Sequence, residues 1–115
     1  MKKVVLFAFN GEFMCFIHVL LNAIDMNERG FDVKVVIEGS ATKLVPELAK
    51  KGNPMFTLYD KARSLDLIEG ACKACSNKMG VLEAVKKEGI ELMDEMSGHP
   101  SIGNYREKGF DVFTF

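Results

Sequence analysis

The sequence predicts a single α/β domain in which a mainly parallel sheet of five strands has helices on both faces. Short apolar runs rich in β-branched residues alternate with segments of helical periodicity, as in doubly wound proteins. The chain has 115 residues, about the size of one domain. Its composition, 48% hydrophobic and 27% charged, is globular and contains no linker-like tract. We therefore expect one domain over residues 1–115, with right-handed crossovers between its strands.

The first strand and the first helix are the clearest elements. Val4 to Phe9 is a continuous apolar run that ends at Asn10-Gly11, which predicts a buried strand. From Glu12 the apolar residues recur with helical spacing as far as Arg29-Gly30, where the glycine ends the helix. The opposite side of this helix is also apolar, which predicts a second cover, such as a neighbouring subunit. Its residues are Met14, Cys15, Val19, Ala23 and Met26.

The later elements continue the alternation. Residues 31–37 form a second apolar run, and Pro46 lies in or near the first turn of a short helix. Asn53 then caps a longer helix that Pro54 opens. A third strand is expected at 67–74, where Glu69 and Gly70 dilute the apolar pattern. We expect the remaining strands at residues 90–93 and 111–115 and the remaining helices at residues 82–87 and 102–108.

Charge and hydropathy exclude several classes of protein. The net charge is −1, so the chain has no basic field that would attract nucleic acid. No apolar stretch approaches the length of a membrane-spanning helix, and the first apolar run is interrupted too early for a signal peptide. We therefore expect a cytoplasmic protein. Its three cysteines, an odd number in a reducing compartment, argue against a structural disulfide framework.

The polar and sulfur-containing residues collect where strands are expected to end. In parallel sheets, ligands bind beyond the carboxyl ends of the strands. Cys72 and Cys75 form a Cys-x-x-Cys pair after the third strand, where a helix start would lower the pKa of a thiolate. His99 follows the fourth strand, and its ring could orient a thiolate or accept its proton. Asn10 and Glu12 follow the first strand, as helix caps or as residues that border the same pocket.

The segment from Cys72 to Gly80, Cys-Lys-Ala-Cys-Ser-Asn-Lys-Met-Gly, resembles the Cys-x-x-Cys-x-x-x-x-Gly motif of the DsrE/DsrF-like family of small sulfur-relay proteins. The likeness extends along the chain, and the Ser97-Gly98-His99-Pro100 tail is similar to a branch of that family. The resemblance implies a sulfur carrier or sulfurtransferase. It also implies that Cys72 accepts sulfane sulfur as a persulfide, with Cys75 as a resolving thiol. Its implied partners are a sulfur donor, a sulfur acceptor and further copies of the chain, in trimers or hexamers.

Two other functions compete with sulfur transfer. A binding module of the same fold would use this edge for a small ligand or a regulatory partner without covalent chemistry. Apart from the zinc alternative, we expect no cofactor. A zinc protein would use Cys72, Cys75 and His99 as three ligands and leave the fourth position open. Cys15 and His18 lie within the first helix and are expected to be core or interface residues. The sequence thus places the chemistry at one sheet edge and leaves its kind open.

Overall fold

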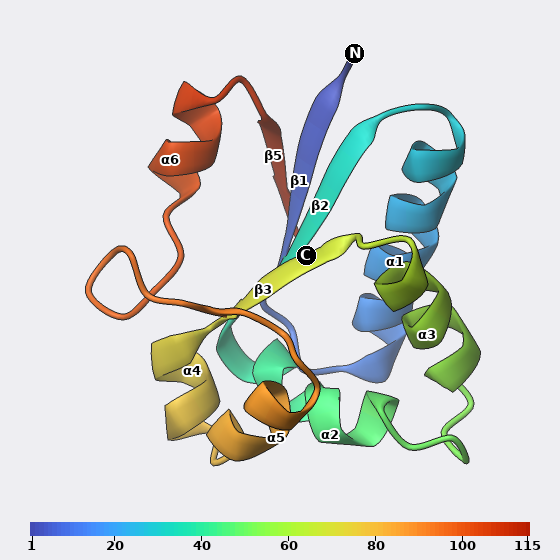
Figure 1. Ribbon diagram of the computed structural model, residues 1–115, viewed down its shortest axis with the longest axis vertical. Coiled ribbons are helices and arrows are strands. Elements are labelled where there is room, and N and C mark those ends of the chain that lie inside the picture. The colour runs from blue at the N-terminus through green and yellow to red at the C-terminus, as the bar shows by residue number, and fades with distance from the viewer.

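A computed structural model describes residues 1–115 and contains one sheet of five strands (Figure 1). All neighbouring strands are parallel, in the order β4-β3-β2-β1-β5. This confirms the predicted α/β class. The strands are β1 (Lys3–Ala8), β2 (Asp32–Ile37), β3 (Ile68–Cys72), β4 (Leu92–Met93) and β5 (Asp111–Thr114). The helices are α1 (Phe13–Glu28), the 3-10 segment η1 (Gly39–Leu44), α2 (Val45–Leu48), α3 (Phe56–Ser64), α4 (Lys73–Lys78), α5 (Leu82–Lys87) and α6 (Ile102–Glu107).

The helices cover the two faces of the sheet unequally. Alternate side chains of β1 and β2 point to opposite faces, as the pleat of a strand requires. One set packs with α1, α2, α3 and α5 into a cluster of 22 buried residues. The other set joins α6 in a cluster of only 5 buried residues. In Figure 1, α1 and α3 stand together on one side of the strands and α6 stands alone on the other.

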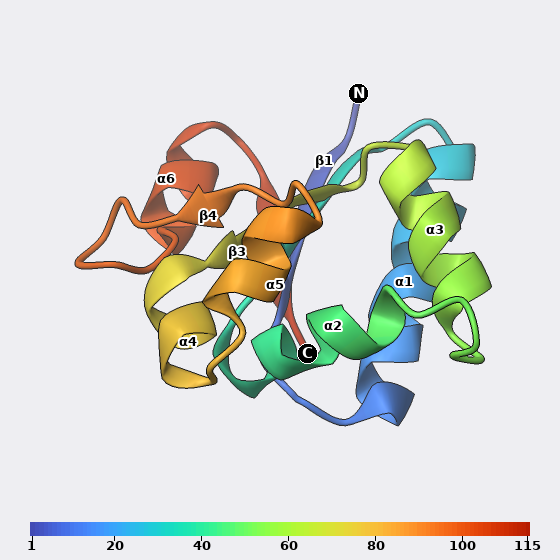
Figure 2. The same cartoon turned by 60° about the horizontal axis from the view of Figure 1, so that its bottom comes forward.

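The sheet departs from the predicted boundaries at its β4 edge. The third strand ends at Cys72, and residues 73 and 74 already belong to α4. The fourth strand is reduced from the predicted 90–93 to two residues beside β3 (Figure 2). Close packing explains the glycine in β3, because a Cβ at Gly70 would lie 2.6 Å from the sulfur of Met93. Gly70 thus lets β4 and its following loop approach the sheet closely.

Two further predictions about the helices need correction. Pro54 does not open α3, which begins at Phe56, although the Asn53 side chain accepts a hydrogen bond from the Met55 amide. Fewer apolar residues on the outer side of α1 are exposed than the sequence predicts. Val19 and Ala23 are completely buried, whereas Met14 is 74% exposed and Leu21 45%. The helix therefore uses more of its circumference against its own domain than the sequence predicts.

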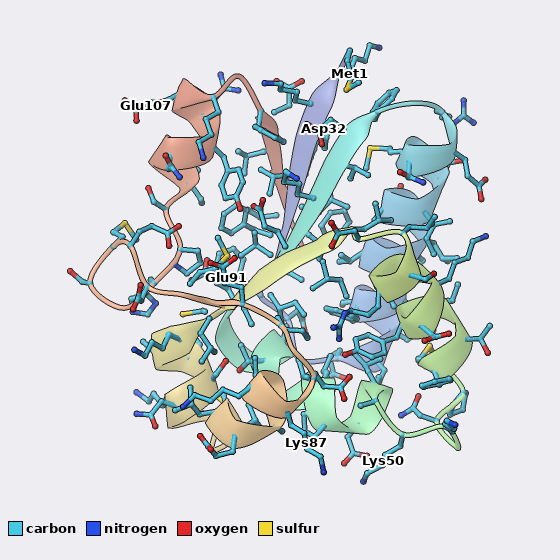
Figure 3. All side chains as sticks on the ribbon, viewed as in Figure 1. Met1, Asp32, Lys50, Lys87, Glu91 and Glu107 are labelled. Atoms are coloured by element: carbon cyan, nitrogen blue, oxygen red, sulfur yellow. The ribbon has the colours of Figure 1, made fainter.

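The carboxyl ends of β2 and β3 lead into η1 and α4, and α4 and α5 lie beyond these strand ends in Figures 1 and 2. Charged side chains such as Lys50 and Lys87 point outward from the periphery (Figure 3). No helix is both long enough and apolar enough to span a bilayer. The residues that follow β2, β3 and β4 lie at the same edge of the sheet, because these strands are parallel neighbours.

Candidate metal centre

Cys72 and Cys75 are held together by the junction of a strand and a helix. Cys72 is the last residue of β3 and is completely buried, and Cys75 lies in the first turn of α4 and is half-buried. The Cys75 backbone N–H donates a hydrogen bond to the Cys72 sulfur at 3.3 Å. A spacing of three residues across this junction therefore places both sulfurs in one site, as the sequence predicted.

His99 reaches the cysteines from the loop that follows β4. Its backbone pairs with Met96 in a tight turn, in which Ser97 (φ 49°) and Gly98 (φ 89°) are left-handed. The Gly98 carbonyl accepts a hydrogen bond of 2.9 Å from the Ala74 N–H at the start of α4. This contact fixes the turn against the helix that carries Cys75. As a result, His99 Nδ1 lies 3.1 Å from Cys72 Sγ and 3.8 Å from Cys75 Sγ.

Glu38 is the fourth member of the site. Glu38 follows β2 directly, and its backbone N–H donates a hydrogen bond to the Ala8 carbonyl. Only 8% of its surface is exposed. Its Oε1 lies 3.8 Å from His99 Nδ1. Glu38 is not among the site residues predicted from the sequence. The rule that selected Cys72 would have found it too, because β2 and β3 are neighbours and both end at this edge.

Four side chains of metal-ligand type lie close together at this edge. One donor atom from each of Glu38, Cys72, Cys75 and His99 lies within 4.8 Å of every other. Both sulfurs and the carboxylate oxygen lie near the same ring nitrogen, Nδ1. In a catalytic triad the third group binds the ring nitrogen that does not face the nucleophile. The arrangement here instead brings four side chains of metal-ligand type close together.

Burial makes this cluster electrostatically unusual. It raises the pKa of the Cys72 thiol to about 12, and the neighbouring Cys75 side chain adds to the shift. Burial also raises the pKa of Glu38, although the His99 charge opposes that shift. The prediction that the helix start lowers the pKa of Cys72 is therefore wrong. The α4 helix has only six residues, and the cost of a buried negative charge exceeds what it offers.

Asn10 and Glu12 do not join the cluster. Both are exposed, and the Asn10 side chain accepts a hydrogen bond from the Glu12 amide at 2.9 Å, which is a local turn contact. Cys15 and His18 lie on α1, half-buried and exposed respectively, and belong to no cluster of metal-ligand type. The sheet edge therefore brings together Cys72, Cys75 and His99 but leaves the residues of the first loop apart.

A polar cavity of about 420 Å³ lies beside the cluster. It shares the Gly98 turn and the first turn of α4 with the site, but none of the four clustered side chains lines it. Its lining residues are Lys73, Ala74, Asn77, Leu82, Asp94 and Gly98. The cavity is therefore a neighbour of the cluster and does not include it.

Two archaeal proteins are similar to this chain. An uncharacterized protein of Methanocaldococcus jannaschii is 28% identical over 95 residues, which cover 83% of this chain and 75% of that protein. An uncharacterized protein of Archaeoglobus fulgidus is 46% identical over 41 residues, or 36% of this chain and 67% of that protein. The chain therefore belongs to one family with the Archaeoglobus protein. No family model and no solved structure matches it.

Proposed function

We propose that this protein binds one zinc ion through Cys72, Cys75, His99 and Glu38. The observation that supports this function is the convergence of two sulfurs and a carboxylate oxygen on one imidazole nitrogen. Zinc–ligand bonds of about 2.0 to 2.3 Å place tetrahedral ligand atoms about 3.3 to 3.8 Å apart. The distances of 3.1, 3.8 and 3.8 Å to His99 Nδ1 lie close to that range, and no two of the four atoms are more than 4.8 Å apart. Small side-chain movements would complete a tetrahedron.

The donor set also indicates the kind of metal and its role. Two thiolates and an imidazole favour zinc over magnesium or calcium, which take oxygen ligands. With Glu38 as the fourth ligand, no coordination position remains for water or substrate. This differs from the three-ligand site with an open position that the sequence allowed. We therefore propose a closed centre that stabilises or regulates the fold, in a reducing cytoplasm that keeps both thiols available.

Metal analysis of purified protein tests this proposal. Protein prepared without chelator or added metal should contain one zinc per chain, and Co²⁺ exchanged into the site should show the visible absorption of tetrahedral coordination with sulfur charge-transfer bands. Replacing a direct ligand, as in Glu38→Gln, Cys72→Ser or His99→Gln, should weaken zinc binding by more than the 10- to 100-fold typical of outer-sphere changes, about 100-fold or more.

The chain offers matched controls for these variants. Cys15→Ser and His18→Gln remove the same side-chain types from α1, outside the cluster, and should leave zinc affinity unchanged. Circular dichroism should confirm that each variant is folded. Wild-type protein that takes up no zinc would contradict the proposal. An equal loss of zinc affinity in Cys15→Ser and in Cys72→Ser would contradict it too.

A second candidate is the sulfane-sulfur transfer that the sequence resemblance implies. It is favoured by the pairing of two thiols, Cys72 and Cys75, with His99 as a neighbouring base. The Cys72 thiolate would attack the outer sulfur of thiosulfate, form a persulfide and release sulfite. The complete burial of Cys72 places this function second. In metal-free protein, thiosulfate should add about 32 Da to wild type and Cys75→Ser but not to Cys72→Ser.

We also propose that the chain assembles into a homo-oligomer, a trimer or hexamer. Met14 and Leu21 on α1 and Phe113 on the edge strand β5 are apolar side chains with 74%, 45% and 53% of their surface exposed. Contact between copies would remove this surface from water. Light scattering at micromolar concentration should give a mass above that of one chain, and Leu21→Glu should lower it. A monomer mass for wild type would contradict the assembly.

A further inference from the structure

We propose that the centre is controlled by oxidation. Peroxide converts Cys72 and Cys75 to a disulfide, the zinc ion dissociates, and the loop around His99 is no longer held by the metal. This inference rests on the proposed zinc binding and assigns a regulation to that site. Three features of the cluster support it. The two thiols are close together, one is more exposed to solvent than the other, and Glu38 and His99 come from separate loops.

The two sulfurs are close enough to bond once no metal separates them. Their ligand atoms lie within the 4.8 Å of the cluster, and the Cys75 N–H already contacts the Cys72 sulfur. A disulfide requires a sulfur–sulfur distance of about 2.05 Å. Rotation of the two side chains supplies this approach, because the cysteines are three residues apart at a strand–helix junction. Zinc and a disulfide therefore exclude each other.

Access to solvent decides which sulfur reacts first. Cys72 is completely buried, whereas Cys75 is half-buried and the adjacent His99 side chain is 40% exposed. Hydrogen peroxide therefore meets the Cys75 thiolate first, transfers one oxygen to it and, with one proton, leaves as water, giving a sulfenic acid. The Cys72 thiolate then attacks that sulfur, and the hydroxyl leaves with a second proton as another water. Two electrons pass from the two thiolates to one peroxide.

The remaining ligands cannot hold the metal alone. Glu38 and His99 provide one oxygen and one nitrogen from two separate loops, and neither side chain has another polar partner beyond the cluster. Loss of zinc therefore frees His99. The turn at 96–99 then keeps one hydrogen bond to α4, from the Ala74 N–H to the Gly98 carbonyl. Because α6 begins at Ile102, soon after this turn, the change reaches the only helix that covers its face of the sheet.

The test follows zinc and thiols in the same sample. Zinc-loaded protein is titrated with hydrogen peroxide while a chromophoric chelator reports released zinc and intact mass reports oxidation. We expect one zinc released per disulfide, a mass loss of about 2 Da and recovery of zinc binding after dithiothreitol. Cys15→Ser should behave like wild type. Cys75→His keeps four ligands but cannot form the disulfide, so it should retain zinc at the peroxide concentration that empties wild type.

Failure of this inference differs from failure of the proposed function. Zinc that stays bound after the disulfide has formed, or that leaves Cys75→His as readily as wild type, would overturn the redox control and leave zinc binding intact. Protein that forms the disulfide but never loads zinc would overturn the metal centre, and with it the regulation built on that centre.

Discussion

At the scale of single residues, the fold of the site acts on Cys72 by changing the pKa of its thiol. Its side chain is completely buried at the end of β3, among a carboxylate, a second thiol and an imidazole. Burial raises its pKa from 9.0 to about 12. In metal-free protein the thiol is therefore protonated near neutral pH and is a weak nucleophile. A bound divalent cation reverses this balance, because it stabilises the thiolate directly.

The raised pKa predicts a defined response of the metal-free protein to pH. In chelator at pH 8.5, iodoacetamide should label Cys72 more slowly than Cys75, as peptide mass mapping would measure. The free energy of unfolding should also depend on pH. The protonated thiol is favoured in the folded state, so its contribution is present below pH 9 and is lost as pH rises from 9 toward 12. Faster labelling of Cys72 than of Cys75 would show that the site does not protect this thiol.

At the scale of elements, the turn between β4 and α6 determines whether His99 can join the cysteines. β4 has only two residues, so the sheet alone fixes this segment poorly. Gly98 supplies the second constraint, since its carbonyl binds the Ala74 N–H and its φ of 89° suits glycine. A Cβ at this position would also lie 3.2 Å from the Cβ of Ala74. The turn and α4 therefore form one unit that positions His99.

Gly98→Ala should consequently damage both stability and metal binding. We expect a loss of about 1 to 2 kcal/mol in the free energy of unfolding from the left-handed conformation alone. Zinc affinity should also fall, because the turn must move away from α4. Chemical denaturation and zinc competition would measure the two effects. The matched control is Gly52→Ala, where a Cβ meets nothing within 4 Å and φ is not left-handed. Unchanged zinc affinity in Gly98→Ala would separate the turn from the site.

At the scale of the whole molecule, the cluster brings together side chains from three connections that follow neighbouring strands of the sheet. Glu38 comes from the β2–η1 connection, Cys72 and Cys75 from the β3–α4 junction, and His99 from the β4–α6 loop. A metal ion there would link the main core to the thinner α6 face. The reversal of strand order lies elsewhere, between β1 and β5. The site therefore lies along the ends of β2, β3 and β4 and away from the switch point.

A metal that binds only the folded protein should raise its thermal stability. At free zinc 100-fold above the dissociation constant, linkage adds about 2.7 kcal/mol to the free energy of unfolding. For a domain of this size we expect the Tm to rise by roughly 10 °C. Differential scanning calorimetry with zinc and with chelator would measure the change. Glu38→Gln should show a smaller rise in Tm at the same zinc concentration. An equal Tm of the wild type with and without zinc would exclude a stabilising metal link between the connections.

The sequence by itself determined the features that depend on neighbouring residues. The apolar run from Val4, the helical periodicity after Glu12 and the pairing of Cys72 with Cys75 are all local, so the fold class and two of the four clustered residues could be predicted. His99 was also selected, through the rule that sites form at strand ends. The extents of the strands at 67–74 and 90–93 were less predictable, because contacts such as Gly70 with Met93 decide them.

Only the tertiary structure decided the role of Glu38 and the protonation of Cys72. A glutamate after a strand has no local pattern that marks it as part of a site. Glu38 joins the cluster because β2 pairs with β3 and the 96–99 turn packs on α4. The pKa of Cys72 likewise depends on burial, which comes from segments far apart in the chain. Local spacing specifies elements, whereas the approach of side chains from three crossovers and the exclusion of water around them exist only once those elements pack.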